Sequence, residues 1–325
     1  MRYFVTGATG FIGRALAKEL LRRGHIVAIV ARNPAKAADL QALGVQVFQG
    51  DITNRESLRA GMIGADGVFH VAGWYKVGTR DKAQGWAVNV EGTRNVLSMM
   101  QELGIPKGVY TSTLAINSDT HGQLVDETYH FTGTHLSEYD RTKAEAHKVA
   151  ALFIRDGLPL VIVQPGLVYG PGDEGVNHDT LQSYLKGTLP MLVQGTAFSW
   201  AHVDDIVQGH ILAMEHGRIG ESYIIAGETK TLIEAMALAE KITGVKAPRL
   251  HAPSGLIKGF SSFMRIIGRV IPLPPLYTGE FLRASASTYI GSNAKARREF
   301  GYDPRPLAEG FGDALRWEME QAKKL

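Results

Sequence analysis

Residues 3–13 read Tyr-Phe-Val-Thr-Gly-Ala-Thr-Gly-Phe-Ile-Gly, and this stretch decides the fold. A short β-rich run at 3–5 leads into three glycines, after which apolar residues recur at helical spacing as far as Gly24. A second, mostly aliphatic run follows at 25–30. Strand, tight turn, helix and strand in this order make a βαβ unit, which predicts parallel pairing and a right-handed crossover.

The same alternation continues along the first half of the chain. Further strands are expected at 45–48, 67–71, 108–111 and 160–163, with a long helix around 143–155. Near-continuous aliphatic strands between helices predict an α/β fold, a doubly wound parallel-sheet Rossmann domain over residues 1–165. The pattern changes after Pro165. Residues 166–325 predict a smaller, mainly helical substrate-binding domain, with a proline break at 272–275 and segments around 199–226 returning to the Rossmann domain.

Composition narrows the class of protein. The chain has 325 residues, 45% of them hydrophobic and 21% charged, which is an ordinary globular balance. There is no cysteine, so disulfides, thiolate zinc sites and cysteine nucleophiles are excluded. The net charge of +3 is scattered, which favours an anionic small molecule over nucleic acid as partner. With a strand starting almost at Met1 and no long apolar run, we expect a cytoplasmic protein without a stable membrane anchor.

The glycine-rich turn predicts a site for a nucleotide cofactor. Glycines between a strand and a helix let backbone N–H groups approach a pyrophosphate, and the helix N-terminus adds a positive dipole. The alternative is a glycine-rich turn that binds nothing, which the βαβ context disfavours. The residues expected to hold the cofactor here are Gly7, Thr9, Gly10, Phe11, Ile12 and Gly13.

The end of the second strand bears on which cofactor is bound. An NAD site usually has Asp or Glu there for the ribose 2′-hydroxyl, whereas Arg32 follows this strand. A planar guanidinium suits a 2′-phosphate, so we favour NADP, with NAD and a merely solvated Arg32 as the alternatives. Asp51 and Ile52, after the third strand, are placed to reach the adenine; alternatively Asp51 caps a helix over 53–60.

Several motifs together resemble the extended short-chain dehydrogenases/reductases, in particular their dihydroflavonol-reductase-like branch, which includes the hopanoid-associated sugar epimerase group. The motifs are the glycine turn, Gly50-Asp51-Ile52, His70-Val71-Ala72-Gly73, Asn89-Val90-Glu91-Gly92-Thr93, Tyr139 to Lys143, Pro165 to Pro171, Val203-Asp204-Asp205-Ile206 and Lys295 to Arg298. The resemblance covers nearly the whole chain. It implies cofactor contacts from Val71, Ala72, Gly73, Pro165 and Gly166, and a homodimer.

Tyr139 and Lys143 stand four apart on an expected helix and therefore project from one face. A phenol titrates near pH 10, so proton transfer near neutrality needs help of about three pKa units, which a neighbouring ammonium can supply. The resemblance makes Tyr139 the general acid/base and gives Lys143 the nicotinamide ribose. It also implies a Ser or Thr hydroxyl on the substrate oxygen, for which we favour Thr113 over the adjacent Ser112.

Aromatic residues near the strand ends are candidates for the substrate side. Trp74 and Tyr75, beside Trp86, follow the fourth strand and could form a wall for a flat or hydrophobic substrate, or simply pack into the core. We place Tyr169 with them. Residues 255–271 carry an apolar stripe with interspersed basic residues, which predicts a lid, a membrane-surface helix or ordinary packing, and we favour packing.

Three functions compete. The first is hydride transfer between NADP(H) and a carbonyl or alcohol; the second is a sugar-nucleotide epimerase that retains NAD; the third is a regulator that binds NADP without turnover, which the presence of Tyr139 and Lys143 disfavours. No metal is expected. The densest cluster, 202–205, lacks a metalloprotease pattern, and the resemblance makes it structural, with Asp204 or Asp205 capping the next helix.

Overall fold

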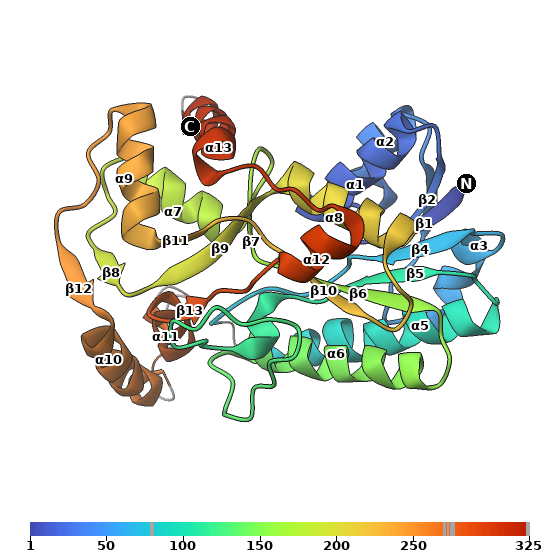
Figure 1. The fold of residues 1–325 in the computed structure, drawn as a ribbon, viewed down its shortest axis with the longest axis horizontal. Coiled ribbons are helices and arrows are strands. Elements are labelled where there is room, and N and C mark those ends of the chain that lie inside the picture. Colours follow the sequence, from blue (N-terminus) through green and yellow to red (C-terminus); the bar gives the residue numbers. More distant parts are fainter. Residues whose placement is uncertain (79–80, 269–270, 272, 274–276, 323–325) are drawn as a thin grey trace.

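A computed structural model describes residues 1–78, 81–268, 271, 273 and 277–322. Its main feature is a parallel sheet of seven strands in the order β10-β6-β5-β4-β1-β2-β3 (Figure 1). The strands in chain order are β1 (Arg2–Thr6), β2 (Ile26–Ala31), β3 (Gln46–Gln49), β4 (Gly67–His70), β5 (Gly108–Thr111), β6 (Leu160–Pro165) and β10 (Ser222–Ile225). The predicted α/β fold is therefore confirmed.

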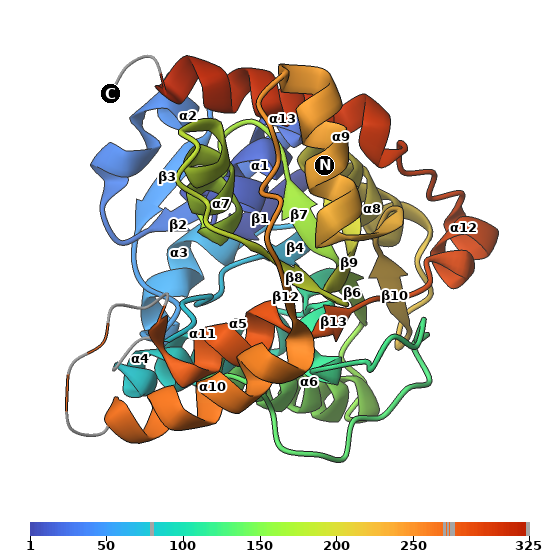
Figure 2. The same ribbon diagram turned by 90° about the vertical axis from the view of Figure 1, so that its left-hand side faces the viewer.

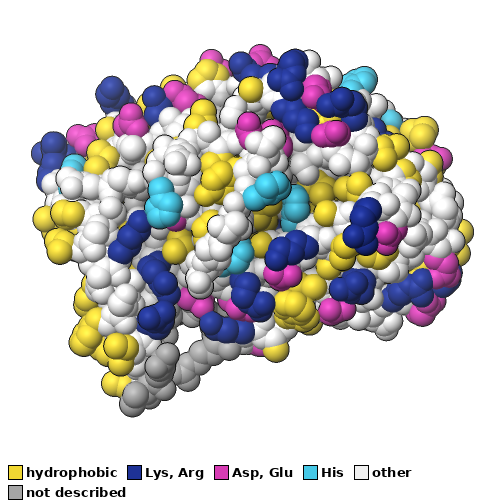
Figure 3. Space-filling view, turned by 60° about the horizontal axis from the view of Figure 1, so that its bottom comes forward, with side chains coloured by type: hydrophobic (Ala, Val, Ile, Leu, Met, Phe, Trp, Pro, Cys, Tyr) yellow, Lys and Arg dark blue, Asp and Glu magenta, His cyan; other side chains and the backbone are white. Residues whose placement is uncertain are grey.

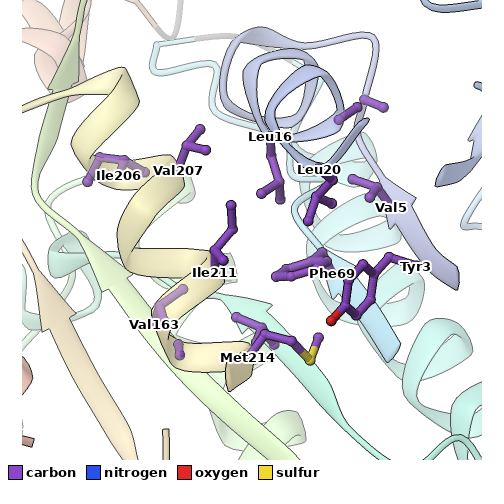
Figure 4. Packing of buried hydrophobic residues seen from close by; sticks show 14 of the residues in the cluster. Tyr3, Val5, Leu16, Leu20, Phe69, Val163, Ile206, Val207, Ile211 and Met214 are labelled. Carbon is purple, nitrogen blue, oxygen red and sulfur yellow. The ribbon is translucent and has the colours of Figure 1, made fainter. Parts of the chain in front are cut away.

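Helices cover both faces of this sheet, because alternate side chains of each strand point to opposite sides. Tyr3 and Val5 of β1 join one core and Phe4 joins the other. Figure 4 shows the first core, where Leu16 and Leu20 lie over the sheet beside Ile211. The first face is covered by α1 (Phe11–Arg22), α2 (Ala38–Ala42), α8 (Val203–His216) and α12 (Ala294–Phe300), and the second by α3 (Arg59–Met62), α5 (Gly92–Glu102) and α6 (Glu138–Arg155).

A second, smaller layer system lies beyond the carboxyl ends of the strands (Figure 1). Its sheet has the order β11-β9-β13, with β7 also paired to β9, and β12 pairs separately with β8. These strands are β7 (Leu167–Tyr169), β8 (Leu192–Gln194), β9 (Ala197–His202), β11 (Thr229–Thr231), β12 (His251–Pro253) and β13 (Thr288–Tyr289). Most have only two or three residues, too few for a sequence period, and apart from a short strand near Ser199 they were not predicted.

The helices of this part lie in two groups (Figure 2). On one side of the small sheet are α7 (Val176–Leu185), α9 (Leu232–Thr243) and α13 (Leu307–Ala322); on the other, α10 (Ser254–Ile267) packs along α11 (Gly279–Ser285). The expected helix over 255–271 thus ends at Ile267, and the proline break at 272–275, except Leu273, lies outside the described residues. A short α4 (Lys82–Trp86) continues through a π-turn, Ala87–Glu91, into α5.

The chain returns to the main sheet after entering the second part. β10 pairs in parallel with β6, with Tyr223 opposite Val163. Helix α8 packs against α1 and over β6 on the same face. Residues after Pro165 therefore supply an edge strand and a covering helix to the Rossmann sheet. None of the helices within the described ranges has both the length and the apolar character needed to cross a bilayer.

Helix α1 packs tightly against the turn that follows β1 at Gly13. A Cβ atom there would lie 2.6 Å from the carbonyl carbon of Gly7 and would overlap its oxygen. Both neighbours are backbone atoms and cannot swing aside. Gly13 is therefore needed for the helix to sit against the strand, which fixes the direction of the α1 N-terminus.

We expect Gly13→Ala to destabilise the fold by about 1–3 kcal/mol, because the added methyl group must displace backbone. Urea unfolding followed by circular dichroism measures this. Gly259→Ala is the matched control, since nothing lies within 4 Å of its added Cβ. That helical variant should gain up to about 1 kcal/mol. Equal stabilities of Gly13→Ala and the parent would contradict the packing argument.

Candidate active site

The glycine turn leaves the start of α1 open to an anion. Gly7 has a φ of +74°, which favours glycine, and the N–H of Gly10 donates to its carbonyl at 2.9 Å. Helix α1 begins without a side-chain cap and with no acidic residue in its first turn. Its first N–H groups are therefore available to a diphosphate, with a favourable dipole. Around the turn Thr9 and Gly10 are exposed, whereas Phe11 and Ile12 are half-buried.

The segment after β4 packs directly on this turn. A Cβ at Gly7 would lie 2.6 Å from the backbone nitrogen of Ala72, so the two backbones approach as closely as glycine allows. The N–H of Ala72 donates to the Thr6 hydroxyl at 3.1 Å. Val71 and Ala72 are half-buried and Gly73 is exposed. A dinucleotide extending from the α1 N-terminus would fit along this edge of the sheet.

Arg32 directly follows β2 and is exposed, with no acidic residue at the strand end. Asn33 is its neighbour, and the Asn33 side chain accepts from the N–H of Ala35 and begins a 3₁₀ turn, Pro34–Ala37. Asp51 also closes a local turn, since its carboxylate accepts from the N–H of Thr53 at 2.9 Å. The next helical turn starts only at Arg55, so the alternative that Asp51 caps a helix over 53–60 is wrong.

Ile52 and the residues after β6 are less open. The Ile52 side chain is buried against Gly92, where a Cβ would lie 2.6 Å from it, so any cofactor contact from Ile52 would use its backbone. Pro165 ends β6 in the core. The next residue, Gly166, passes so close to β9 that a Cβ would overlap the carbonyl oxygen of Ser199. This position therefore forms the seam between the two parts of the molecule.

The three proposed catalytic side chains come together at the carboxyl end of β5. Thr113 follows that strand, and its hydroxyl faces the phenol of Tyr139 on α6 closely enough to lower the pKa of that phenol. Ser112 points the other way, to the Nδ1 of His147 at 2.9 Å. The alternation of side chains along an extended segment accounts for this difference. Of the two hydroxyls, only that of Thr113 faces Tyr139.

Lys143 is buried one turn further along α6. Its Nζ donates to the carbonyl of Thr111 at 2.7 Å and to the Tyr110 hydroxyl at 3.3 Å. It also lies 4.9 Å from the centre of the Tyr110 ring. Burial lowers the pKa of Lys143 to about 7. A Cβ at Gly73 would lie 3.9 Å from this nitrogen, which places Lys143 beside the expected cofactor edge.

Burial raises the pKa of Tyr139 to about 12, although the Thr113 hydroxyl opposes the shift and the charge of Asp140 adds to it. The expectation that the Lys143 ammonium lowers this pKa is thus not met in the structure. The reason is geometric, because the ammonium is held by Thr111 and Tyr110 on the strand side of the helix.

Asn89 is a buried residue of the site to which we assigned no role from sequence. Its amide nitrogen donates to the Thr142 hydroxyl and to the carbonyl of Trp74, both at 2.9 Å. Its oxygen accepts from the N–H of Trp74 at 2.7 Å. Asn89 thereby ties the loop after β4 to α6. It sits in the π-turn before α5, a feature that is frequent at functional sites. The motif at 89–93 was the available signal.

Asp140 is a second such residue, and it connects α6 to the second part. Its carboxylate accepts from Ser137 at 2.7 Å, from Tyr289 of β13 at 3.2 Å and from Ser118 at 3.4 Å. Ser118 has a φ of +51°, a strained conformation for a residue with a side chain. Burial raises the pKa of Asp140 to about 7.

The proposed substrate residues have different surroundings. Tyr75 is 61% exposed and lies near Gly175, whereas Trp74 is buried and its ring packs on Gly85. Tyr169 is buried between Trp200 and Phe311 in the core of the second part, which argues against contact with a substrate. Tyr75 is therefore the exposed member of the three.

The cluster at 202–205 has structural partners. The His202 ring, rather than Asp204 or Asp205, caps α8 by accepting from the N–H of Asp204 at 3.2 Å, which corrects the expected cap. Asp205 pairs with Arg305 at 2.9 Å. Among the residues that the structure describes, no group of three His, Asp or Glu side chains is arranged to hold a metal ion.

Comparison with known proteins shows the family to which this chain belongs. The sequence profile of the NAD dependent epimerase/dehydratase family matches residues 3–226. The chain belongs to this family. It is 30% identical to sterol demethylase protein B of Methylococcus capsulatus over 99% of both chains, and 31% identical to a putative dihydroflavonol 4-reductase of Synechocystis over 97% of this chain and 94% of that one. The crystal structure of gox2253 is similar with a TM-score of 0.85, 31% identity and 98% of each chain covered.

Family membership confirms the resemblance to extended short-chain dehydrogenases/reductases. This family member is therefore an NAD(P)-dependent oxidoreductase of the short-chain dehydrogenase/reductase type. The family description covers epimerases and dehydratases as well as the reductases found among its relatives. The site residues of this enzyme, rather than its family, therefore determine which of these reactions it catalyses.

The raised pKa of Asp140 has a consequence for the stability of this family member. Its carboxyl titrates near pH 7 when folded and near pH 4 when unfolded, so the stability it contributes is present below about pH 4 and lost as the pH rises to about 7. The free energy of unfolding of the parent, relative to Asp140→Asn, should fall by up to about 4 kcal/mol across this range.

Urea unfolding of both proteins at several pH values measures this difference. Asp156→Asn, which removes an exposed carboxylate just after the same helix, is the matched control and should follow the parent at every pH. A difference between parent and Asp140→Asn that stays constant with pH would refute the assignment.

Proposed function

We propose that this enzyme is an NADP-dependent reductase or dehydrogenase that interconverts a carbonyl and an alcohol. The proposal rests on one observation: Thr113, Tyr139 and Lys143 lie together at the carboxyl ends of the strands, where the glycine turn also lies. These are the groups that a carbonyl reduction needs for the oxygen of its substrate. A sugar-nucleotide epimerase that retains NAD is the alternative.

The nicotinamide supplies or accepts the hydride, and the chain handles the proton. In the reducing direction, Tyr139 gives its phenolic proton to the carbonyl oxygen as the C–H bond forms, and the product is an alcohol. Thr113 donates a hydrogen bond to the same oxygen and holds it beside the phenol. The buried Lys143 would bind the nicotinamide ribose, and the Tyr139 phenolate would regain its proton from solvent. In the oxidising direction each of these transfers runs backwards.

Two further observations support the proposal. Arg32 is exposed at the end of β2, where a 2′-phosphate would lie, and no carboxylate stands there to prefer the 2′-hydroxyl of NAD. One relative, 31% identical to this chain, is a putative dihydroflavonol 4-reductase, whose name denotes carbonyl reduction. Homodimer formation and a cytoplasmic location stay predictions.

Tyr139→Phe should lower kcat by about 10²–10⁴-fold, because it removes the proton donor and leaves the ring in place. NADPH consumption with a dihydroflavonol and with a cyclic ketone measures this effect, and calorimetry should give an unchanged NADPH affinity. Tyr129→Phe, a partly exposed tyrosine outside the site, is the control and should retain parental activity. Undiminished turnover by Tyr139→Phe would remove Tyr139 from the mechanism.

Arg32→Ala should weaken NADP⁺ binding by about 10–100-fold, the effect of losing a hydrogen bond to a charged group. The affinity for NAD⁺ should hardly change. Titration calorimetry with both nucleotides measures this selectivity, and Arg155→Ala, an exposed arginine at the end of α6, is the matched control. If the parent instead retains NAD through purification and Arg32→Ala changes neither affinity, the epimerase alternative is favoured.

A further inference from the structure

Three polar side chains stand at the same level of neighbouring strands in the main sheet. Thr6 of β1 lies opposite His70 of β4, and His70 lies opposite Tyr110 of β5. Register partners in parallel strands point to the same face, and here it is the face of α5 and α6, since Tyr110 belongs to that core. Thr6 directly precedes Gly7 of the glycine turn, whereas Tyr110 contacts Lys143. These strands therefore bring polar side chains from the expected diphosphate site towards the expected nicotinamide ribose site.

The His70 ring is buried and has a hydroxyl beside each nitrogen. Figure 3 shows histidine side chains at the surface of one face of the molecule, but His70 is only 1% exposed. Its Nδ1 lies 2.8 Å from the Thr6 hydroxyl, and its Nε2 lies 3.0 Å from the hydroxyl of Thr93 on α5. The ring also stacks on Tyr110, with the ring centres 5.4 Å apart. Burial and the nearby charge of Lys143 lower the pKa of His70 to about 3, so the ring is neutral and carries a single proton.

Thr93 links this ring to the phenol beside Lys143. The Thr93 hydroxyl lies close enough to the Tyr110 phenol to lower its pKa, although burial raises that pKa overall. The Lys143 Nζ donates to the same phenol at 3.3 Å. Thr6, His70, Thr93, Tyr110 and Lys143 thus form a continuous row, which we call the polar row. All five side chains are buried, so each proton in the row needs a partner there.

The proton positions in the polar row follow from its Lys143 end. A charged Lys143 can only donate, and burial keeps the Tyr110 phenol protonated. The phenol must therefore donate to its other polar neighbour in the described part of the chain, the Thr93 hydroxyl. Thr93 then donates to the Nε2 of His70, so the ring proton is on Nδ1 and is donated to Thr6. The hydrogen bonds of the row run in one direction, from the ammonium to the glycine turn.

The Thr6 end of the polar row is attached to the expected cofactor edge. The Thr6 hydroxyl also accepts from the N–H of Ala72 at 3.1 Å, and the backbone of Ala72 packs on Gly7. A displacement within the row would therefore change the distance between the turn and the Lys143 ammonium.

We propose that His70 and Thr93 are positioning residues, which hold Lys143 at a fixed distance from the glycine turn so that one dinucleotide can engage both. The inference rests on the proposed function, in which Lys143 binds the nicotinamide ribose. Thr93 lies on the Lys143 side of His70 and acts through Tyr110. Its loss should therefore weaken contacts at the nicotinamide end of the cofactor and leave the adenosine end unchanged.

Thr93→Val tests this, because it removes the hydroxyl and keeps the shape of the side chain. We expect kcat with NADPH and a cyclic ketone to fall by about 10–100-fold, since Lys143 is misplaced. Calorimetry should show NADPH binding weakened by roughly tenfold. The affinity for 2′,5′-ADP, which lacks the nicotinamide half, should stay at the parental value. If the parent binds NAD rather than NADP, NADH and ADP make the same comparison.

Two variants separate positioning from a general loss of stability. Thr93→Ser keeps the hydroxyl and should restore the parental values. Thr196→Val is the matched control, since Thr196 is equally buried and donates to the carbonyl of Ser285 in the second part at 2.7 Å. It should lose similar stability in urea unfolding but keep kcat and both affinities. Equal weakening of NADPH and 2′,5′-ADP binding by Thr93→Val, or no recovery in Thr93→Ser, would overturn the proposal.

The tautomer of His70 is a readout that needs no turnover. Proton–nitrogen correlation spectra of the histidine-labelled parent are recorded at about pH 6, where Lys143 is charged because its pKa is about 7. The His70 signals, identified by their absence from His70→Gln, should show the proton on Nδ1 and should shift in Thr93→Val. A ring protonated on Nε2 would overturn the polar row. A parent that gives the expected tautomer and binding results but reduces no carbonyl would contradict the proposed reductase alone and support the positioning role.

Discussion

The hydrogen bond from the Lys143 ammonium to the carbonyl of Thr111 is the contact on which the geometry of the site depends. A buried ammonium is costly unless it has partners, and here a carbonyl, a phenol and an aromatic face surround it. Meeting this requirement fixes where α6 lies along β5. Tyr139, one turn earlier, is thereby placed beside Thr113, while His147, one turn later, receives Ser112. One buried cation thus determines which of two adjacent hydroxyls faces the phenol.

Helix α6 is also held from its other sides by buried polar groups. Asn89 joins it to the loop after β4, and Asp140 joins it to β13 in the second part. Asp119 connects the loop beyond Thr113 to both β13 and α10. Each of these side chains has several partners, so losing one contact would leave others buried and unpaired. The site is therefore built from segments that are distant in sequence but share hydrogen bonds, and the second part contributes directly to its rigidity.

Features that depend on local pattern could be predicted from the sequence. The glycine turn, the parallel strands and the i, i+4 pair on α6 all rest on short-range periodicity, and the structure has them near the expected residues. The roles of Asn89 and Asp140 could not be predicted, because their partners are far along the chain: Thr142 for Asn89 and Tyr289 for Asp140. The expectation that Tyr169 lies on the substrate side meets the same limit, because packing against Phe311, far along the chain, buries it. The strands of the second sheet are too short to show a period.

The chain forms β7, β8 and β9 between β6 and β10, which has a consequence for biosynthesis. When residues 1–165 have left the ribosome, β6 can pair with β5 but still lacks β10 on its other side, and α8 is absent from the core over β1. The exposed edge of β6 is then a template for wrong pairing. The sheet closes only after residue 225 has emerged, by which time β7, β8 and β9 are already present. The sheet therefore stays incomplete while about sixty further residues are synthesised. A chaperone would be most useful to the chain during this interval.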